Sequence, residues 1–469
     1  MLQNNTIKSN KKIKNNKTQL HVINVKNQNQ NQTQNQNIVN EKCINICTLT
    51  NNNKKIIRQV YNPSNISNTN LSYNNIKPSS VEVDRTFYLT IKYYITLNGN
   101  AQPGGNIMDS WGYDIAPRCM FINNSFSKIS LQLNNQIFTQ NKNSILGIEE
   151  RIKWKSSQSY LSESCTVADQ SQLYSELVES NRNPLGGIQY SEPDQVTARG
   201  GFNGIEVTSN TPTSATFYLT GTEPIMISPL IWKNLLKKPF IHLNNINFNG
   251  IFDSDLCSRV LSISDSNPDM LTCTISPISS TLNLTFYNVQ PATPITKSLS
   301  YSYYQYNQIT INNTTPLQSN GTAELTINDI IIHPNTKYIY IYVKQTNYNI
   351  RTTNTFARIN NLSITSINNI SVLNSISPHQ LYQISIKNGI ELTWDQWYGS
   401  TSGLRRNTSG VGSILCISPV IDLGIKSSDI TKISITINYT SLIPNYVLTP
   451  ITYSAYAFSV DKYSYLIQQ

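Results

Sequence analysis

Hydrophobic and polar residues alternate over most of the chain from residue 81 onward, in runs that are separated by turns rich in Asn, Gly and Pro. In residues 281–289, TLNLTFYNV, the side chains of Leu282, Leu284 and Phe286 fall on one face. This period of two is typical of β-strands with one buried face. Similar runs predict strands at residues 81–97, 128–138, 214–232, 240–252, 297–311, 323–333, 338–346, 357–367, 412–421, 432–442 and 451–467.

Local signals refine three of these predictions. The Asn134-Asn135 pair in the middle of residues 128–138 predicts a hairpin turn. Pro224 and Pro229 interrupt residues 214–232, which predicts an edge strand or a bend, because proline cannot donate to a sheet ladder. Helix is predicted only for residues 149–174 and around 173–179, and for the start of residues 378–397.

The strand runs fall into two successive sets, each with one helical insert, and 469 residues exceed what one ordinary sandwich needs. Only 13% of the residues are charged, which suits half-buried strands better than long helices. The prediction is an all-β protein with two tandem β-sandwiches, spanning residues 81–290 and 291–469.

The first 80 residues differ in composition and are predicted to form a disordered basic N-terminal arm. Residues 27–37, NQNQNQTQNQN, are low-complexity polar sequence with nothing to bury. Residues 1–60 hold ten basic side chains and one acidic one, so they carry nine of the ten net positive charges of the chain. The arm residues expected to contact nucleic acid are Lys8, Lys11, Lys12, Lys14, Lys17, Lys26, Lys54, Lys55 and Arg58. The hypothesis rests on counterion release from a polyanion; a merely solvated tail is the alternative.

No stretch has the apolar core of a signal peptide or the length of a membrane-spanning segment, so we expect synthesis in the cytosol or nucleus and no membrane span. The chain has seven scattered cysteines, interpreted as small buried hydrophobes or idle thiols in a reducing compartment. They are Cys43, Cys47, Cys119, Cys165, Cys257, Cys273 and Cys416.

No constellation of residues indicates catalysis. The four histidines lack metal-ligand spacing, and no glycine-rich phosphate loop follows a strand, so no metal, cofactor or enzymatic activity is expected. Glu149 with Glu150, or Asp253 with Asp255, would have to supply the carboxylates of a glycosidase, and neighbouring acids are ordinarily a solvated loop. The aromatic runs at residues 301–306 and 393–399 admit two interpretations, sugar binding or plain strand packing.

Several segments in order resemble major capsid proteins of small icosahedral viruses, of the virophage-like, polinton-like and related environmental DNA virus kind. They are residues 121–138, FINNSFSKISLQLNNQIF; 179–187, ESNRNPLGG; 198–202, ARGGF; 220–232, TGTEPIMISPLIW; 354–364, NTFARINNLSI; and 377–397, SPHQLYQISIKNGIELTWDQW. Together they span most of the sequence expected to fold.

The resemblance implies a double jelly roll, two eight-stranded sandwiches side by side, that forms homotrimeric capsomers and then a closed icosahedral shell in the virion. It also implies minor capsid or penton proteins as partners and packaged nucleic acid as the partner of the arm. A single jelly roll with a protruding β domain, and a β-sandwich carbohydrate-binding or fibre adhesin, are the alternatives. The missing secretion signal and the basic arm argue against the adhesin.

Overall fold

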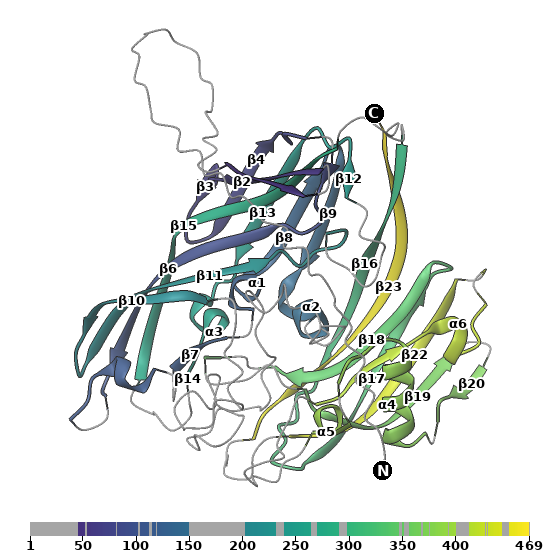
Figure 1. Cartoon of the computed structure of the whole chain (residues 1–469). Helices are drawn as coiled ribbons and strands as arrows, with labels where there is room; N and C mark the ends of the chain where they lie inside the picture. Colours follow the sequence, from purple (N-terminus) through teal and green to yellow (C-terminus); the bar gives the residue numbers. More distant parts are fainter. Residues whose placement is uncertain are drawn as a thin grey trace, which may run out of the picture.

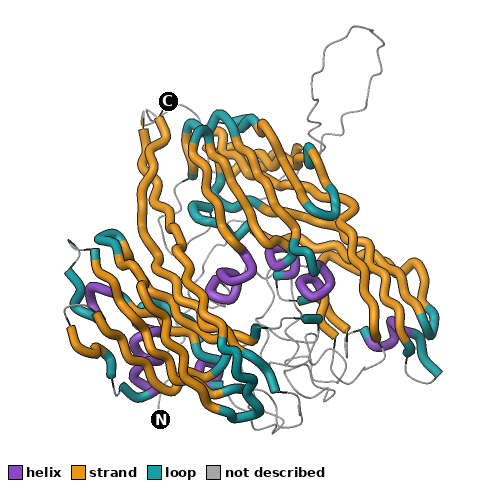
Figure 2. Tube along the Cα trace, turned by 180° about the vertical axis from the view of Figure 1, so that it is seen from behind, coloured by secondary structure: helices purple, strands orange, loops and turns teal. Residues whose placement is uncertain are grey.

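The computed structural model describes residues 46–51, 54–80, 82–101, 104–111, 115–118, 120–149, 202–230, 239–263, 270–289, 298–346, 349–350, 356–366, 369–374, 376–392, 394–399, 412–426, 428, 430–442 and 450–468. Antiparallel strands dominate these residues and form two sandwiches (Figures 1 and 2).

The first sandwich consists of an eight-stranded and a five-stranded sheet. The larger sheet has the order β1-β2-β15-β6-β11-β10, with β5 and β12 attached to it. Its strands are β1 (Ile46–Asn51), β2 (Lys54–Tyr61), β5 (Glu82–Val83), β6 (Tyr88–Gly99), β10 (Phe202–Asn210), β11 (Ser214–Pro224), β12 (Phe240–Ile241) and β15 (Met270–Val289). The smaller sheet has the order β3-β4-β13-β8-β9, from β3 (Asn65–Ile66), β4 (Asn70–Ile76), β8 (Phe126–Leu133), β9 (Gln136–Asn141) and β13 (Ile246–Phe252).

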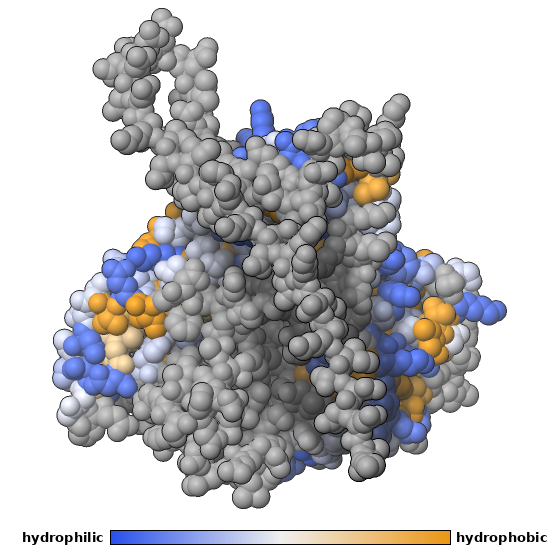
Figure 3. Space-filling view, in the orientation of Figure 1, coloured by the Kyte–Doolittle hydropathy of each residue, from blue (hydrophilic) through white to orange (hydrophobic). Residues whose placement is uncertain are grey.

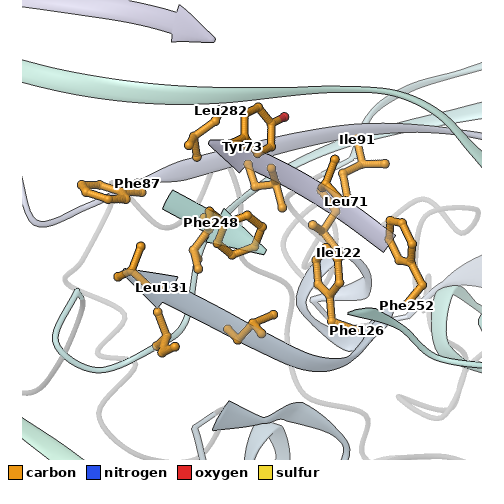
Figure 4. Packing of buried hydrophobic residues seen from close by; sticks show 14 of the residues in the cluster. Leu71, Tyr73, Phe87, Ile91, Ile122, Phe126, Leu131, Phe248, Phe252 and Leu282 are labelled. Atoms are coloured by element: carbon orange, nitrogen blue, oxygen red, sulfur yellow. The ribbon is translucent and has the colours of Figure 1, made fainter. Parts of the chain in front are cut away.

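The core of this sandwich follows directly from the period of two. In β6, every second residue from Leu89 to Leu97 is buried, while the residues between them are only partly buried. Side chains from both sheets meet between the layers, where Leu71 and Leu282 approach from opposite sheets (Figure 4). Within the smaller sheet, Phe126 and Phe252 stack with ring centroids 4.8 Å apart. Burial of this interdigitated apolar surface is the main stabilising term of the sandwich.

The second sandwich consists of two four-stranded sheets with the orders β16-β23-β18-β21 and β17-β22-β19-β20. The strands are β16 (Ser298–Asn312), β17 (Thr322–Ile332), β18 (Thr336–Gln345), β19 (Arg358–Ser366), β20 (Asn369–Val372), β21 (Ile414–Ile417), β22 (Thr431–Thr440) and β23 (Tyr453–Gln468). Three helices pack on it, namely α4 (Pro378–Lys387), α5 (Trp394–Tyr398) and α6 (Pro419–Asp422).

Both sandwiches have the same strand order. If β2, β4, β6, β8, β9, β11, β13 and β15 are counted as strands one to eight, the two sheets run one-eight-three-six and two-seven-four-five. The strands β16 to β23 of the second sandwich, counted in the same way, give identical orders. This arrangement of two interlocked Greek keys is the jelly roll, so the chain is a double jelly roll. Two equivalent sandwiches exclude the alternative of one jelly roll with an unrelated protruding domain.

The start of the first sandwich differs from the sequence prediction. Folded sequence was expected from residue 81, but β2 and β4 lie within residues expected to be a loose arm and supply the first two strands of the jelly roll. In β4, Leu71 and Tyr73 show the alternating burial of a strand with one buried face. Asn75 has a φ of 56° and lies beside an irregularity in the pairing of β4 with β13. Ile76 is therefore buried, although strict alternation after Leu71 and Tyr73 would have exposed it. The strand consequently lacks a clear hydrophobic pattern in the sequence.

Other local predictions have mixed outcomes. The hairpin at Asn134 is confirmed, because β8 and β9 pair around this residue and its φ is 52°. Two alternatives were predicted for residues 214–232, an edge strand or a bend, and the edge position is wrong because β11 lies between β6 and β10. The strand ends at Pro224, where the missing amide disturbs the ladder least. The helix α2 spans Lys142–Glu149, and the helices expected over 149–174 and 173–179 lie outside the described residues apart from Glu149. The boundary expected at residues 290 and 291 falls outside them as well.

Candidate functional site: the joint between the two sandwiches

Several buried charged and polar contacts lie where the two sandwiches meet. Helix α2, the paired strands β16 and β23, and the side chain of Arg118 all bridge the two halves. Figures 1 and 2 show β16 and β23 as a long ribbon that extends from the second sandwich along the first. We refer to these three elements together as the joint.

Helix α2 carries a buried ion pair. Lys142 and Glu149 are seven positions apart, so two helical turns place them on one face. Their side chains are 0% and 3% exposed, and Lys142 Nζ lies 2.6 Å from Glu149 Oε2. Lys142 also donates to the carbonyl oxygen of Met226, and Gln140 donates to the other Glu149 oxygen. The charges are therefore paired and hydrogen-bonded, as burial requires.

The same helix inserts apolar side chains into the second sandwich. Ile145 and Ile148 belong to the core of that sandwich, although α2 follows directly on β9 of the first. Ser144 donates to the side-chain oxygen of Gln308 on β16, and the Tyr342 hydroxyl donates to the Ser144 carbonyl. Helix α2 thus holds both sandwiches together through packing and hydrogen bonds.

The ribbon of β16 and β23 divides its side chains between two cores. Tyr301, Tyr465 and Ile467 belong to the core of the first sandwich, whereas Phe458 and Val460 of the same ribbon belong to the core of the second. Within the first core, Phe138 of β9 meets the Tyr465 ring edge-on with centroids 5.2 Å apart. The last strand of the chain therefore completes both halves.

Tyr301 ties the ribbon to the segment before β12. Its hydroxyl accepts a hydrogen bond from the Ile241 amide at 2.8 Å and donates one to the Pro239 carbonyl at 3.0 Å. The guanidinium of Arg85 lies 5.2 Å from the centroid of the Phe240 ring and 5.9 Å from that of Tyr301. Burial raises the pKa of Tyr301 to about 12, so the hydroxyl stays neutral over the physiological range.

Two more charged side chains are fully buried, Arg118 within the joint and Glu223 on β11. Arg118 donates from Nη2 to the Asn349 carbonyl of the second half at 2.8 Å, while its own amide donates to Val260 of the first. The carboxylate of Glu223 accepts the amides of Ile122 and Asn123 at 3.0 and 2.9 Å. These amides belong to the first turn of α1 (Phe121–Asn124), which has no intrahelical acceptor for them.

The structure describes few of the basic residues predicted to contact nucleic acid. Lys8, Lys11, Lys12, Lys14, Lys17 and Lys26 lie outside the described residues. The backbones of Lys54, Lys55 and Arg58 form part of β2, where they pair with Val289, Asn288 and Thr285 of β15. Arg58 is exposed, so this one side chain of the predicted set is seen to be available to a partner.

The carboxylates considered for catalysis have structural partners. Glu149 belongs to the buried ion pair, and Glu150 lies outside the described residues. Asp253 lies 3.3 Å from the Arg259 guanidinium and accepts from Asn143, and Asp255 accepts the Ser258 amide at the start of α3 (Leu256–Val260). Within the described part of the chain, no group of three or more His, Cys, Asp or Glu side chains is arranged to hold a metal ion.

The aromatic runs pack inside the protein. Tyr301 lies in the first core, and Tyr304 and Tyr306 pack against the second. Trp397 is fully buried and donates its indole N–H to the Ile414 carbonyl at 2.7 Å. Strand and helix packing therefore accounts for these residues, as the plainer of the two interpretations predicted.

Sequence reasoning missed the charged residues of the joint. Arg118 and Lys142, like Glu223 nearby, have no feature in their local sequence that marks them as buried. The only available signal was the seven-residue spacing of Lys142 and Glu149, which is meaningful once residues 142–149 are known to be helical. No helix in the described residues is long and apolar enough to cross a membrane.

Comparisons with known proteins match both halves of the chain. The family model of the Sputnik virophage major capsid protein first domain matches residues 34–292, and that of the major capsid protein V20 C-terminal domain matches residues 303–455. The Sputnik virophage structure solved by cryo-electron microscopy superposes with a TM-score of 0.78 at 20% identity, covering 96% of this chain and 92% of the Sputnik chain. The mavirus major capsid protein gives a TM-score of 0.71 at 15% identity and covers 88% and 90%. No curated protein sequence matches.

Proposed function

The chain belongs to the family of Sputnik-like virophage major capsid proteins, and from this premise we propose that it forms trimeric capsomers that close into an icosahedral shell around the viral genome. The observation that carries the proposal is the repeated jelly roll joined by buried contacts. Two equivalent sandwiches in each of three subunits present six similar blocks, a shape suited to hexagonal packing in a shell.

The surface of the subunit is consistent with reversible assembly. The exposed large hydrophobic residues of the described part are scattered over several elements, including Val207 on β10, Ile251 on β13 and Ile421 on α6. On the face shown in Figure 3, apolar residues form small separate patches among polar ones. Interfaces built from such patches gain specificity from many weak contacts and do not aggregate freely at high concentration.

Assembly is tested with the purified full-length protein. Light scattering coupled to gel filtration is expected to show a trimer, and negative-stain microscopy is expected to show closed particles or hexagonal capsomers. A protein that stays monomeric at every concentration and ionic strength would contradict the proposal. The proposed function involves no catalysis. Minor capsid or penton proteins would fill the positions in the shell that a hexagonal capsomer cannot occupy.

The basic arm is proposed to lie against packaged nucleic acid. Its support is the charge segregation in residues 1–60 together with the exposed side chain of Arg58. Deleting residues 1–60 would be a poor test, because the deletion removes β1 and nearly all of β2. Glutamine substitutions at Lys8, Lys11, Lys12, Lys14, Lys17 and Lys26 leave every described strand unchanged.

The matched control replaces six exposed lysines of the folded body with glutamine, namely Lys77, Lys128, Lys337, Lys387, Lys426 and Lys462. Both variants lose six positive charges. The arm variant is expected to bind nucleic acid with a much shallower salt dependence, because every phosphate that the arm no longer neutralises lowers the slope of log K against log salt by about 0.7–0.9. Equal binding by the two variants would refute a specific role for the arm.

A further inference from the structure

Two of the cysteines interpreted as idle thiols lie side by side in the first sandwich. Cys257 on α3 and Cys273 on β15 are sixteen positions apart, and Cys257 Sγ lies 2.8 Å from the Cys273 carbonyl oxygen. Both side chains are partly exposed and border the first core. The fully buried Cys416 of the second core differs from them in exposure.

The environment of the two thiols makes them unequal. The hydrogen bond between the two thiols lowers the pKa of Cys257 below its ordinary value, whereas the same contact and burial raise the pKa of Cys273 well above it. Because the thiolate is the reactive form, Cys257 is the better nucleophile and reacts first.

We infer that Cys257 and Cys273 are a redox-responsive pair that closes into an intramolecular disulfide when the assembled protein leaves the reducing interior of the cell. The inference rests on the proposed capsid function, because a shell is built in the cytosol or nucleus and then meets oxidising surroundings.

The reaction balances with a small disulfide, such as oxidised glutathione, as the oxidant. The Cys257 thiolate attacks one glutathione sulfur, the S–S bond breaks, and one glutathione leaves as a thiolate that takes up a proton. Cys273 then loses its proton to water, and its sulfur attacks Cys257 and expels the second glutathione. Each cysteine gives up one electron, and the oxidant is reduced to two glutathione molecules.

The position of the pair gives the disulfide a mechanical role. The carbonyls of Arg259 and Val260, at the end of α3, accept hydrogen bonds from Asn124 and from the Arg118 amide. Arg118 reaches across the joint to the second sandwich. A disulfide to β15 would therefore fasten the large sheet to the contacts that hold the two halves together, and the closed loop would restrict the unfolded chain.

The test uses the full-length protein, equilibrated in buffers of defined ratio of reduced to oxidised glutathione and then alkylated. Peptide mapping by mass spectrometry is expected to find Cys257 linked to Cys273 in the oxidising buffers, while Cys416 remains a thiol. The Cys273→Ser variant is expected to stop at a glutathione adduct on Cys257. Cys257→Ser retains a hydroxyl that can donate to the Cys273 carbonyl, so the fold is preserved while the linkage cannot form.

Thermal unfolding provides the second readout. Oxidation is expected to raise the melting temperature of the wild-type protein by several degrees and to leave that of Cys257→Ser unchanged. Alkylation of both cysteines at every glutathione ratio, or an adduct on wild-type Cys257 that never resolves, would overturn the inference. Because the thiols are mapped on unassembled protein, this failure is distinguishable from a failure to form particles, which would affect the proposed function alone.

Discussion

Lys142 and Glu149 are sealed inside the joint, where the cost of stripping water from two charges is recovered only while both are present. Replacing Lys142 with Met leaves the carboxylate buried beside Gln140 without its cation. We expect Lys142→Met or Glu149→Leu alone to lower the free energy of unfolding by about 3–5 kcal/mol. Urea denaturation of the purified protein measures the change.

The double variant Lys142→Met/Glu149→Leu is the matched control for this pair. With both charges replaced by apolar groups of similar size, most of the stability is expected to return, because no unpaired charge remains. If the two single effects simply add in the double variant, the pair does not act as a unit and the joint is held by packing alone.

Gly412 occupies a position that no side chain can share. Its φ is 83°, and a Cβ atom would clash with the carbonyl oxygen of Phe356. Gly424 has a similar φ of 65° with nothing within 4 Å, so it isolates the cost of the backbone conformation. We expect Gly424→Ala to cost about 1–2 kcal/mol, and Gly412→Ala to cost several times more because β21 must shift.

Melting temperatures of the two glycine variants, measured under the same conditions, give this difference. A Gly412→Ala protein as stable as Gly424→Ala would show that the segment before β21 moves away from Phe356 at little cost.

At the scale of elements, the last strand serves two cores at once. Tyr465 is 9% exposed and packs in the first core, while its neighbour Leu466 points outward and is 53% exposed. Tyr465→Ala is expected to destabilise the first sandwich by about 3–5 kcal/mol, and Leu466→Ala to change stability by less than about 0.5 kcal/mol.

Hydrogen exchange of the two variants distinguishes where the destabilisation occurs. Amides of β8 and β9, close to Phe138, are expected to exchange faster in Tyr465→Ala, while those of β19 and β22 stay protected. Uniformly faster exchange over both sandwiches would mean that the halves unfold as a single cooperative unit.

Element prediction succeeded where the buried face kept a strict period. Residues 282–286 and 433–439 alternate without interruption, and they form parts of β15 and β22. In β4, Asn75 shifts the phase, so the buried Ile76 looks like an isolated apolar residue in polar sequence. The order of strands within the sheets was beyond the sequence pattern, because the strands that pair, such as β2 and β15, are more than 200 residues apart. The resemblance to capsid proteins implied the double jelly roll, and the structure supplied the order.

The candidate site was less predictable than the fold, for a physical reason. Buried charges such as Arg118 and Glu223 are defined by what surrounds them in three dimensions, and their local sequence resembles that of exposed residues. The arm charges, by contrast, were visible at once, because their segregation is a property of the sequence itself.

For the whole molecule, the many buried tyrosines predict a stability that falls at alkaline pH. Burial raises the pKa of Tyr301 to about 12 and those of Tyr73, Tyr93 and Tyr465 further, whereas tyrosines of the unfolded chain titrate near pH 10. Below pH 10 the hydroxyls are neutral in both states, and their contribution to stability is complete. Above pH 10 the unfolded chain loses protons that the folded chain keeps, so the free energy of unfolding decreases until the folded pKa is passed.

Urea unfolding followed by tyrosine absorbance between pH 9 and pH 12 is therefore expected to show a steep decrease in stability over this range. Tyr301 contributes to this decrease, because its pKa is about 12 in the folded protein and near 10 in the unfolded chain. Tyr301→Phe is expected to be less stable at neutral pH, because Ile241 and Pro239 lose a hydrogen-bond partner, but to show a shallower decline above pH 10. Equal slopes for the wild type and this variant would show that Tyr301 does not contribute to the alkaline decrease, and absorbance at the tyrosinate band separates tyrosine ionisation from lysine deprotonation, because only tyrosine contributes to it. Since Tyr301 joins the ribbon to the first sandwich, its ionisation would loosen the same joint that the buried ion pair holds on its other side.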